Sequence, residues 1–269
     1  MMRAYMSVFK LRISTGLQYR AAALAGIGTQ FFFGFMFIMI FEAFYAHSTG
    51  QEPPMTLSQV ITYTWLRQAF LALVMLWLRD NELFSLIKSG NIAYEMCRPT
   101  SIYNFWYAKL LAQRLSSALL RCSPILLVTV FLPRPYRLEL PPDWLTFLIF
   151  LAVLVVSMLM VVAISMLIYI SVFVTMSPGG SLLIFSVFGD FLAGMLVPVP
   201  LMPGWMQEII YLLPFHYTVD FPFRVFTGDI AKLDALQGLA AQTAWLIALV
   251  AFGKFTMNRS LRRVVVQGG

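Results

Sequence analysis

The sequence is poor in charge, cysteine and histidine, and each shortage argues against a class of protein. Charged side chains make up only 12% of the 269 residues, whereas a soluble domain carries about 25%, so a soluble globular protein is excluded. We expect no structural disulfide, because Cys97 falls in a predicted cytoplasmic loop and Cys122 inside a predicted span. His47 and His216 are not accompanied by an H-E-x-x-H motif or a cysteine pair that would indicate a metal site.

Nucleotide-binding and catalytic signatures are also missing. The phosphate-binding loop G-x-x-x-x-G-K-[ST] does not occur, and Gly253-Lys254 is followed by Phe255 without the required upstream glycine. There is no G-x-S-x-G motif and no pair of acids within the apolar segments that would indicate a protease or lipid transferase. We therefore expect this chain to be no enzyme and to carry no cofactor or metal of its own.

Apolar residues are abundant, at 60% of the chain, and the mean hydropathy is +0.79. A membrane-spanning helix needs about 20 apolar residues, so the length allows about six spans joined by short loops. These features predict an all-α integral membrane protein that forms one domain over residues 1–269. The spans are expected at about residues 21–46, 55–78, 103–132, 144–175, 180–198 and 236–256.

The distribution of basic residues predicts the orientation in the membrane. The net charge of +7 is interpreted as an orientation signal and not as a nucleic-acid-binding surface, because cytoplasmic loops carry an excess of lysine and arginine. This excess places both termini in the cytoplasm. The residues that carry it are Arg3, Lys10, Arg12 and Arg20, then Arg79, Lys88, Arg98 and Lys109, then Lys254, Arg259, Arg262 and Arg263.

The first residues, about 2–18, have the pattern of an amphipathic helix that lies on the membrane surface. Tyr5, Phe9 and Ile13 share one face with Met2 and Met6. The alternative is that the first span simply begins early.

The segment between the second and third spans, residues 79–100, contains a second amphipathic pattern. Leu83, Phe84 and Ile87 form an apolar edge, and the residues on the opposite side are polar. A short amphipathic helix between two spans has two plausible roles: it lies on the lipid surface, or it inserts its apolar edge into a groove on a cytoplasmic partner.

Prolines interrupt the chain between the fifth and sixth spans, where Pro198 and Pro200 are the first of a series. Proline ends or breaks a helix, yet the segment remains apolar and resumes helical spacing from Trp205. Such a broken segment at membrane depth must be shielded by protein. We therefore predict a hairpin of re-entrant or interfacial half-helices over residues 199–228.

These motifs together resemble one family. The succession VPVPLMPGW, LPF, and P followed by FTG is similar to the outer segment of type-2 ABC exporter permeases. Ile92, Arg98, Pro99 and Tyr103 are similar to the I-x-x-x-x-x-RP-x-x-x-Y pattern that follows the coupling helix of that family. The resemblance spans nearly the whole chain.

The resemblance implies a six-span permease subunit in the bacterial inner membrane. The partners would be two cytoplasmic ABC ATPase subunits, which hold ATP and Mg²⁺, a second permease that is identical or related, and membrane lipids, with no nucleic acid. The substrate would be a drug, peptide, lipid or glycan, and apolar spans alone cannot choose among these. The implied ATPase-coupling residues are Glu82, Leu83, Phe84, Ile87, Lys88 and Arg98, and the implied outer gate contains Pro200, Pro203, Trp205, Glu208, Pro214 and Phe215.

Ionisable groups inside predicted spans are functional candidates because burying them in a membrane is costly. Four stand out: Glu42, Arg67, Arg121 and Asp190. Arg67 is in a position to pair with Glu42, and Arg121 with Asp190, while Arg114 is expected to extend to the cytoplasmic interface.

Two readings of Asp190 stay open. It is either hydrogen-bonded to a neighbouring helix, or it couples protons in a self-sufficient secondary transporter or channel, which is the alternative function. A non-transporting membrane anchor is a third possibility. The small residues Gly189, Ala193 and Gly194 would pack either between two permeases or within one.

Overall fold

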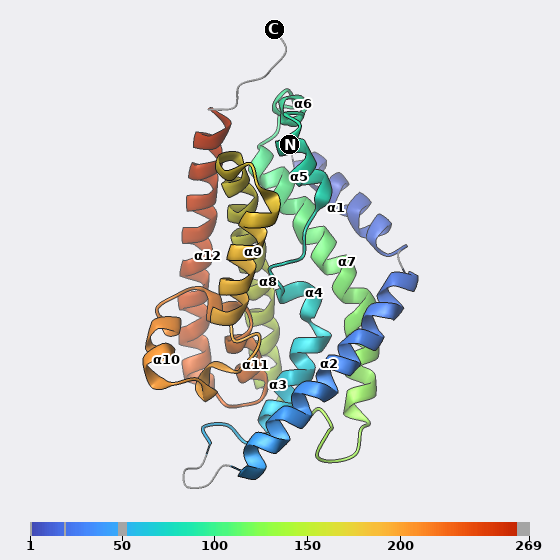
Figure 1. Cartoon of the computed structure of the whole chain (residues 1–269), viewed down its shortest axis with the longest axis vertical. Coiled ribbons are helices and arrows are strands. Elements are labelled where there is room, and N and C mark those ends of the chain that lie inside the picture. The colour runs from blue at the N-terminus through green and yellow to red at the C-terminus, as the bar shows by residue number, and fades with distance from the viewer. Residues whose placement is uncertain (1, 19, 48–52, 263–269) are drawn as a thin grey trace.

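The computed structural model describes residues 2–18, 20–47 and 53–262, and these ranges contain helices and no strand. The predicted all-α class is thereby confirmed. Four long helices give the molecule its elongated shape (Figure 1). They are α2 (Arg20–His47), α7 (Ile102–Val130), α8 (Trp144–Thr175) and α12 (Lys232–Leu261).

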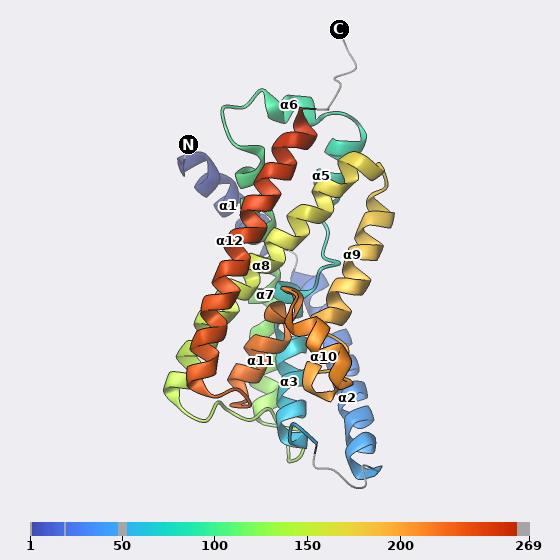
Figure 2. The same ribbon diagram turned by 90° about the vertical axis from the view of Figure 1, so that its left-hand side faces the viewer.

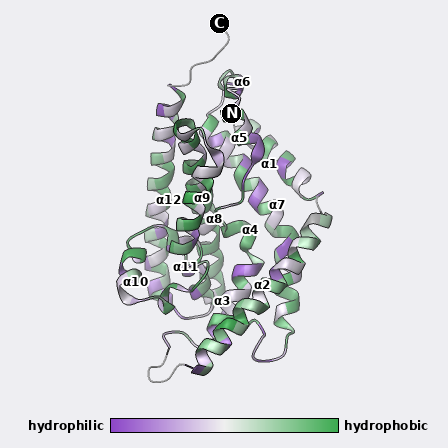
Figure 3. Cartoon of the chain, in the orientation of Figure 1, coloured by the Kyte–Doolittle hydropathy of each residue, from purple (hydrophilic) through white to green (hydrophobic). Residues whose placement is uncertain are grey.

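Within the described ranges, three segments are long and apolar enough to cross a membrane: Ala23–His47 within α2, and the whole of α8 and α12. A shorter apolar helix, α9 (Pro178–Leu192), lies beside α8. Hydrophobic residues run along α8, α9 and α12 (Figure 3). This is the composition expected of a membrane protein.

Helix α8 is the centre of the packing, since it contacts α7, α9, α11 and α12. Its bounds are those predicted. Asp143 caps its start, because the Asp143 carboxylate accepts a hydrogen bond from the Thr146 amide at 3.0 Å. The same carboxylate pairs with Lys232 Nζ at 2.7 Å, which fixes the start of α12. Ser101 caps α7 in the same manner, since its side chain accepts a hydrogen bond from the Asn104 amide.

The predicted second span, 55–78, is not one helix. It consists of α3 (Leu57–Ala69) and α4 (Leu71–Val74), and the chain is extended at Met75. No proline or glycine causes this break. The break is stabilised by residues distant in sequence: charged side chains of other helices bind the backbone groups that it leaves without helical partners.

The predicted fifth span, 180–198, ends early. Helix α9 stops at Leu192, and Gly194 adopts a left-handed conformation with φ of +79°. Glycine adopts this conformation without steric cost, so this residue and not the later prolines ends the helix. Asp190, predicted near the middle of the span, therefore lies in the last turn of α9.

The proline-rich hairpin, residues 199–228, contains four short helices that wrap around the lower part of the bundle in Figure 1. They are η1 (Val199–Leu201), α10 (Gly204–Tyr211), η2 (Phe215–Thr218) and α11 (Asp220–Phe226). The predicted series of short helices is therefore present over this range.

The opposite end of the molecule gathers α1 (Met2–Gly16), α5 (Asn81–Lys88), α6 (Ile92–Met96) and the last turns of α12 (Figures 1 and 2). Helix α1 packs against α7, where a Cβ at Gly16 would lie 2.2 Å from Ser116 Oγ. The amphipathic helix thus rests partly on protein. We call this the α1 end, and the other the hairpin end.

Candidate functional site

The break in the predicted second span is held by Arg114, a residue of α7 that is only 1% exposed. Its Nη1 donates to the carbonyls of Leu73 and Met75, at 3.3 and 2.7 Å, and its Nη2 donates to Ser165 Oγ at 2.8 Å. Free backbone carbonyls inside an apolar bundle need such donors. The expectation that Arg114 extends to the interface is therefore wrong.

Asp190 binds the other side of the same break. Its Oδ1 accepts a hydrogen bond from the Leu76 amide at 3.2 Å. One cation and one anion, from α7 and α9, thus satisfy the carbonyl and amide groups that the interrupted helix leaves free.

Arg121 does not meet Asp190, so the expected pairing of these two residues is wrong. It lies against α2, where a Cβ at Gly26 would be 2.9 Å from its Cζ. Within the described chain, its Nε has no hydrogen-bond partner and the residue forms no ion pair.

Arg67 likewise does not pair with Glu42. The Arg67 guanidinium donates to the carbonyls of Met195 and Leu196, the latter at 3.2 Å, and stands 4.1 Å over the Phe37 ring. Glu42 instead accepts a hydrogen bond from the Tyr136 hydroxyl at 3.3 Å. Arg67 therefore joins α3 to the chain that follows α9.

A buried carboxylate holds the hairpin to the bundle. Asp220 is fully buried and accepts hydrogen bonds from the Val199 amide at 2.9 Å and from Arg224 Nη1 at 3.3 Å. Tyr63 donates to the Gly194 carbonyl at 2.8 Å. A Cβ at Gly194 would lie 3.0 Å from the Tyr63 hydroxyl and 3.1 Å from the Asp220 Cβ, so this turn requires glycine for space as well as for φ.

Asp220, Arg224 and Tyr63 were not among the candidates selected from the sequence. The available signal was the i, i+4 spacing of Asp220 and Arg224 on a short helix. The small residues around Asp190 pack within the chain: Gly189 lies against Leu76 and Phe215, and Ala193 is buried.

The six residues assigned to an outer gate are divided between surface and core. Pro203, Trp205 and Glu208 are exposed, Pro200 and Phe215 are partly buried, and Pro214 is buried. The predicted apolar face of α10 points outward, since Trp205, Ile209 and Leu212 are at least half exposed. That orientation suits a helix in contact with lipid.

At the α1 end, the apolar edge of α5 faces the wrong way for the docking role assigned to it. Leu83, Phe84 and Ile87 are buried within the protein, and the Phe84 ring lies 4.4 Å from that of Tyr169 in α8. The prediction that this edge enters a groove on a partner is corrected accordingly: α8 and α7 already cover it.

Ion pairs tie the 79–100 loop to its neighbours. Glu82 pairs with Arg12 of α1 and with Lys109 of α7, the latter at 3.2 Å. Partial burial raises the pKa of Glu82, but Lys109 and then Arg12 outweigh it and lower the pKa overall. Glu95 of α6 holds the same lysine at 3.6 Å and Arg98 at 3.7 Å.

The side of this loop that faces away from α7 and α8 is exposed to solvent. Tyr94 and Met96 of α6 are 74% and 43% exposed, and Lys88 and Arg98 are exposed beside them. Large apolar side chains on an exposed helical tip are candidates for contact with another protein. Neither Tyr94 nor Met96 had been selected from the sequence.

Comparison with known proteins adds no constraint to this geometry: no protein-family model matches the sequence, and no curated protein is significantly similar to it.

Proposed function

We propose that the chain is the permease subunit of an ATP-driven ABC-type exporter, which forms the path for a hydrophobic or amphiphilic substrate and is driven by a separate ATPase. The observation that carries the proposal is the folded 79–100 loop. It is fixed to α1, α7 and α8 on one side and offers a partly apolar tip on the other. An element of this kind transmits force between a partner and the spans.

The loop is directly connected to the broken span. The Asp80 amide donates to the Tyr169 hydroxyl at 2.6 Å, and only a few residues separate Asp80 from Met75, where the Arg114 contacts begin. In the proposed mechanism, closure of the ATPases moves α5 and α6, and the extended chain at Met75 allows α5 to move relative to α3 and α4.

The proposed membrane arrangement has six spans: α2, α3 with α4, α7, α8, α9 and α12, in the bacterial inner membrane. Both termini are proposed to be cytoplasmic. This is supported by the excess of basic residues in α1, in the 79–100 loop and in the last turns of α12, all of which meet at one end of the molecule.

The proposed partners are two ABC ATPase subunits, which bind ATP and Mg²⁺, and a second permease that is identical or related. Because the apolar edge of α5 is buried, the docking surface is assigned to the exposed faces of α5 and α6. This surface consists of Glu82, Ser85, Lys88, Tyr94, Met96 and Arg98.

One observation favours the alternative of a self-sufficient proton-coupled transporter. Asp190 lies at a discontinuous helix, which is where secondary transporters bind their coupling ions. Its hydrogen bond to the Leu76 amide gives it a structural role that requires no proton transfer. A flux assay distinguishes the two functions: only the alternative predicts that the purified chain moves substrate across a membrane when a proton gradient is present and no ATPase is.

Changing Tyr94 and Met96 together to aspartate is expected to lower co-purification of an ATPase subunit from native membranes about tenfold or more. Because both side chains are exposed, the free energy of unfolding should change by about 0.5 kcal/mol or less per site. The matched control, Tyr94→Phe with Met96→Leu, should retain the ATPase. Mass spectrometry of the affinity-purified sample provides the measurement.

Phe84→Asp is unsuitable for this test because it buries a charge and disrupts the loop itself. If the double aspartate variant recovers as much ATPase as the wild type, α6 does not form part of the ATPase-binding surface. Recovery of the wild-type chain without any ATPase, together with proton-driven flux, would favour the alternative function.

A further inference from the structure

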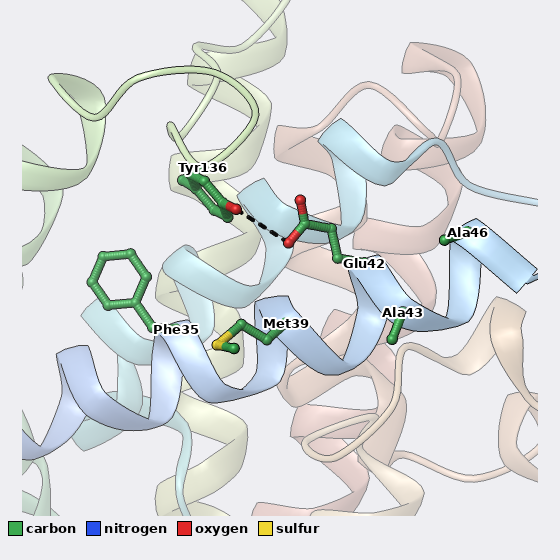
Figure 4. Close-up of a pocket in the computed structure, with 6 residues that line it drawn as sticks. All are labelled: Phe35, Met39, Glu42, Ala43, Ala46 and Tyr136. Carbon is green, nitrogen blue, oxygen red and sulfur yellow. Dashed lines mark hydrogen bonds between the residues drawn. The ribbon is translucent and has the colours of Figure 1, made fainter.

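A groove of about 650 Å³ runs along α2 at the hairpin end and is closed on one side by the loop that follows α7 (Figure 4). Its volume lies within the range of about 300–1,000 Å³ typical of small-molecule sites. Most of its lining is apolar. The residues that line it are Phe35, Met39, Glu42, Ala43, Ala46 and Tyr136.

Glu42 is the only carboxylate in this lining, and no cation in the described part of the chain pairs with it. Its hydrogen bond from the Tyr136 hydroxyl, at 3.3 Å, occupies one oxygen. Among the described residues, no ion pair joins Glu42 to a lysine, arginine or histidine.

Two nearby cations are engaged elsewhere, and Arg137, which follows Tyr136 in the loop, forms no ion pair with Glu42. Arg67 binds backbone carbonyls and the Phe37 ring, and Arg134 pairs with Glu139 at 3.9 Å. The neighbouring segment 48–52, which lies outside the described residues, contains no lysine or arginine in its sequence. A carboxylate beside apolar surface is costly unless it is paired, so a cationic ligand would be favoured here.

The side chains around Glu42 suit a cation with an apolar body. Figure 4 shows the Glu42 carboxylate and the Tyr136 hydroxyl turned toward each other, with Phe35 and Met39 further along the helix. Aromatic faces attract organic cations, and methionine adapts to ligands of varied shape. The alanines at 43 and 46 leave space that larger side chains would fill.

We propose that this groove binds a lipophilic organic cation, with its charge beside Glu42 and its apolar groups against Phe35, Met39 and Tyr136. That such a cation is the exported substrate rests on the proposed function; its binding to the groove does not. A soluble amphiphilic cation is the proposed occupant, and the ammonium group of a membrane lipid is the competitor that the experiment must exclude.

The test uses radiolabelled tetraphenylphosphonium and the full chain in phosphatidylglycerol nanodiscs, with empty nanodiscs as background and no ATPase present. Glu42→Gln is expected to weaken binding about tenfold or more. Met39→Trp, which fills the groove and keeps the carboxylate, should weaken it to a similar degree. Tetraphenylborate, which has the same shape and the opposite charge, should show no loss on Glu42→Gln.

Glu139→Gln is the matched control, because this carboxylate lies in the same loop as Tyr136 but does not line the groove. It should bind the probe as the wild type does, and all variants should show unchanged thermal unfolding. Wild-type affinity in Glu42→Gln would overturn the proposal. So would displacement of the probe by added phosphatidylethanolamine, since a lipid ammonium would then be the occupant.

This outcome is independent of the exporter assignment. If no ATPase co-purifies but the probe binds in a Glu42-dependent manner, the proposed cation site is supported and the proposed exporter function is contradicted. If the ATPase is recovered and the probe does not bind, the reverse holds.

Discussion

Replacing Arg114 with methionine is expected to lower the free energy of unfolding by about 4 kcal/mol. The methionine keeps the length and apolar volume of the side chain but donates no hydrogen bond. The carbonyls of Leu73 and Met75 and the hydroxyl of Ser165 then lose a charged donor inside the bundle. Each buried polar group that loses its partner costs about 1–3 kcal/mol.

The measurement is a urea titration of the purified chain in detergent micelles, with helicity followed by circular dichroism. Arg121→Met is the matched control, since it removes an arginine from the same helix whose Nε has no partner in the described chain. Its effect should be smaller than that of Arg114→Met by about 2 kcal/mol or more. Equal losses in the two variants would show that Arg114 does not hold the break.

The contrast between α8 and the second span shows what the sequence can predict. The bounds of α8 follow from local signals, an aspartate cap at Asp143 and an apolar run that ends at Thr175. The break at Met75, after α4, has no local signal. Its partners, Arg114 and Asp190, are distant in sequence from the groups they bind, so only the folded chain reveals them.

The 79–100 loop illustrates a second limit. Periodicity correctly placed Leu83, Phe84 and Ile87 on one face of a helix. It could not say whether that face would be covered by another protein, by lipid, or by the chain itself, because an amphipathic pattern specifies burial and not the partner. Here Tyr169 and Trp106 provide the cover.

The charged residues inside the predicted spans were paired incorrectly. The predictions matched cation with anion, Arg67 with Glu42 and Arg121 with Asp190. In the structure, Arg67 and Asp190 bind backbone groups instead. Backbone acceptors and donors become available only where helices end, so a search for opposite charges cannot find them.

Replacing Asp220 with leucine is expected to destabilise the hairpin and to lower the free energy of unfolding by about 3 kcal/mol. Leucine is similar in size, but it leaves the Val199 amide without its acceptor and removes one of the two carboxylates that hold Arg224. Because Asp229 still pairs with Arg224, we expect a smaller loss than for Arg114→Met.

Two measurements separate a local from a global effect. Urea titration gives the free energy, and hydrogen–deuterium exchange should rise mainly in residues 199–228, since Asp220 links the start of η1 to α11. The matched control is Glu208→Leu, an exposed acid on α10 of the same hairpin, which should change the free energy by about 0.5 kcal/mol or less. If exchange rose equally in α8 and in the hairpin, Asp220 would support the whole bundle, and the hairpin could not move as a separate unit.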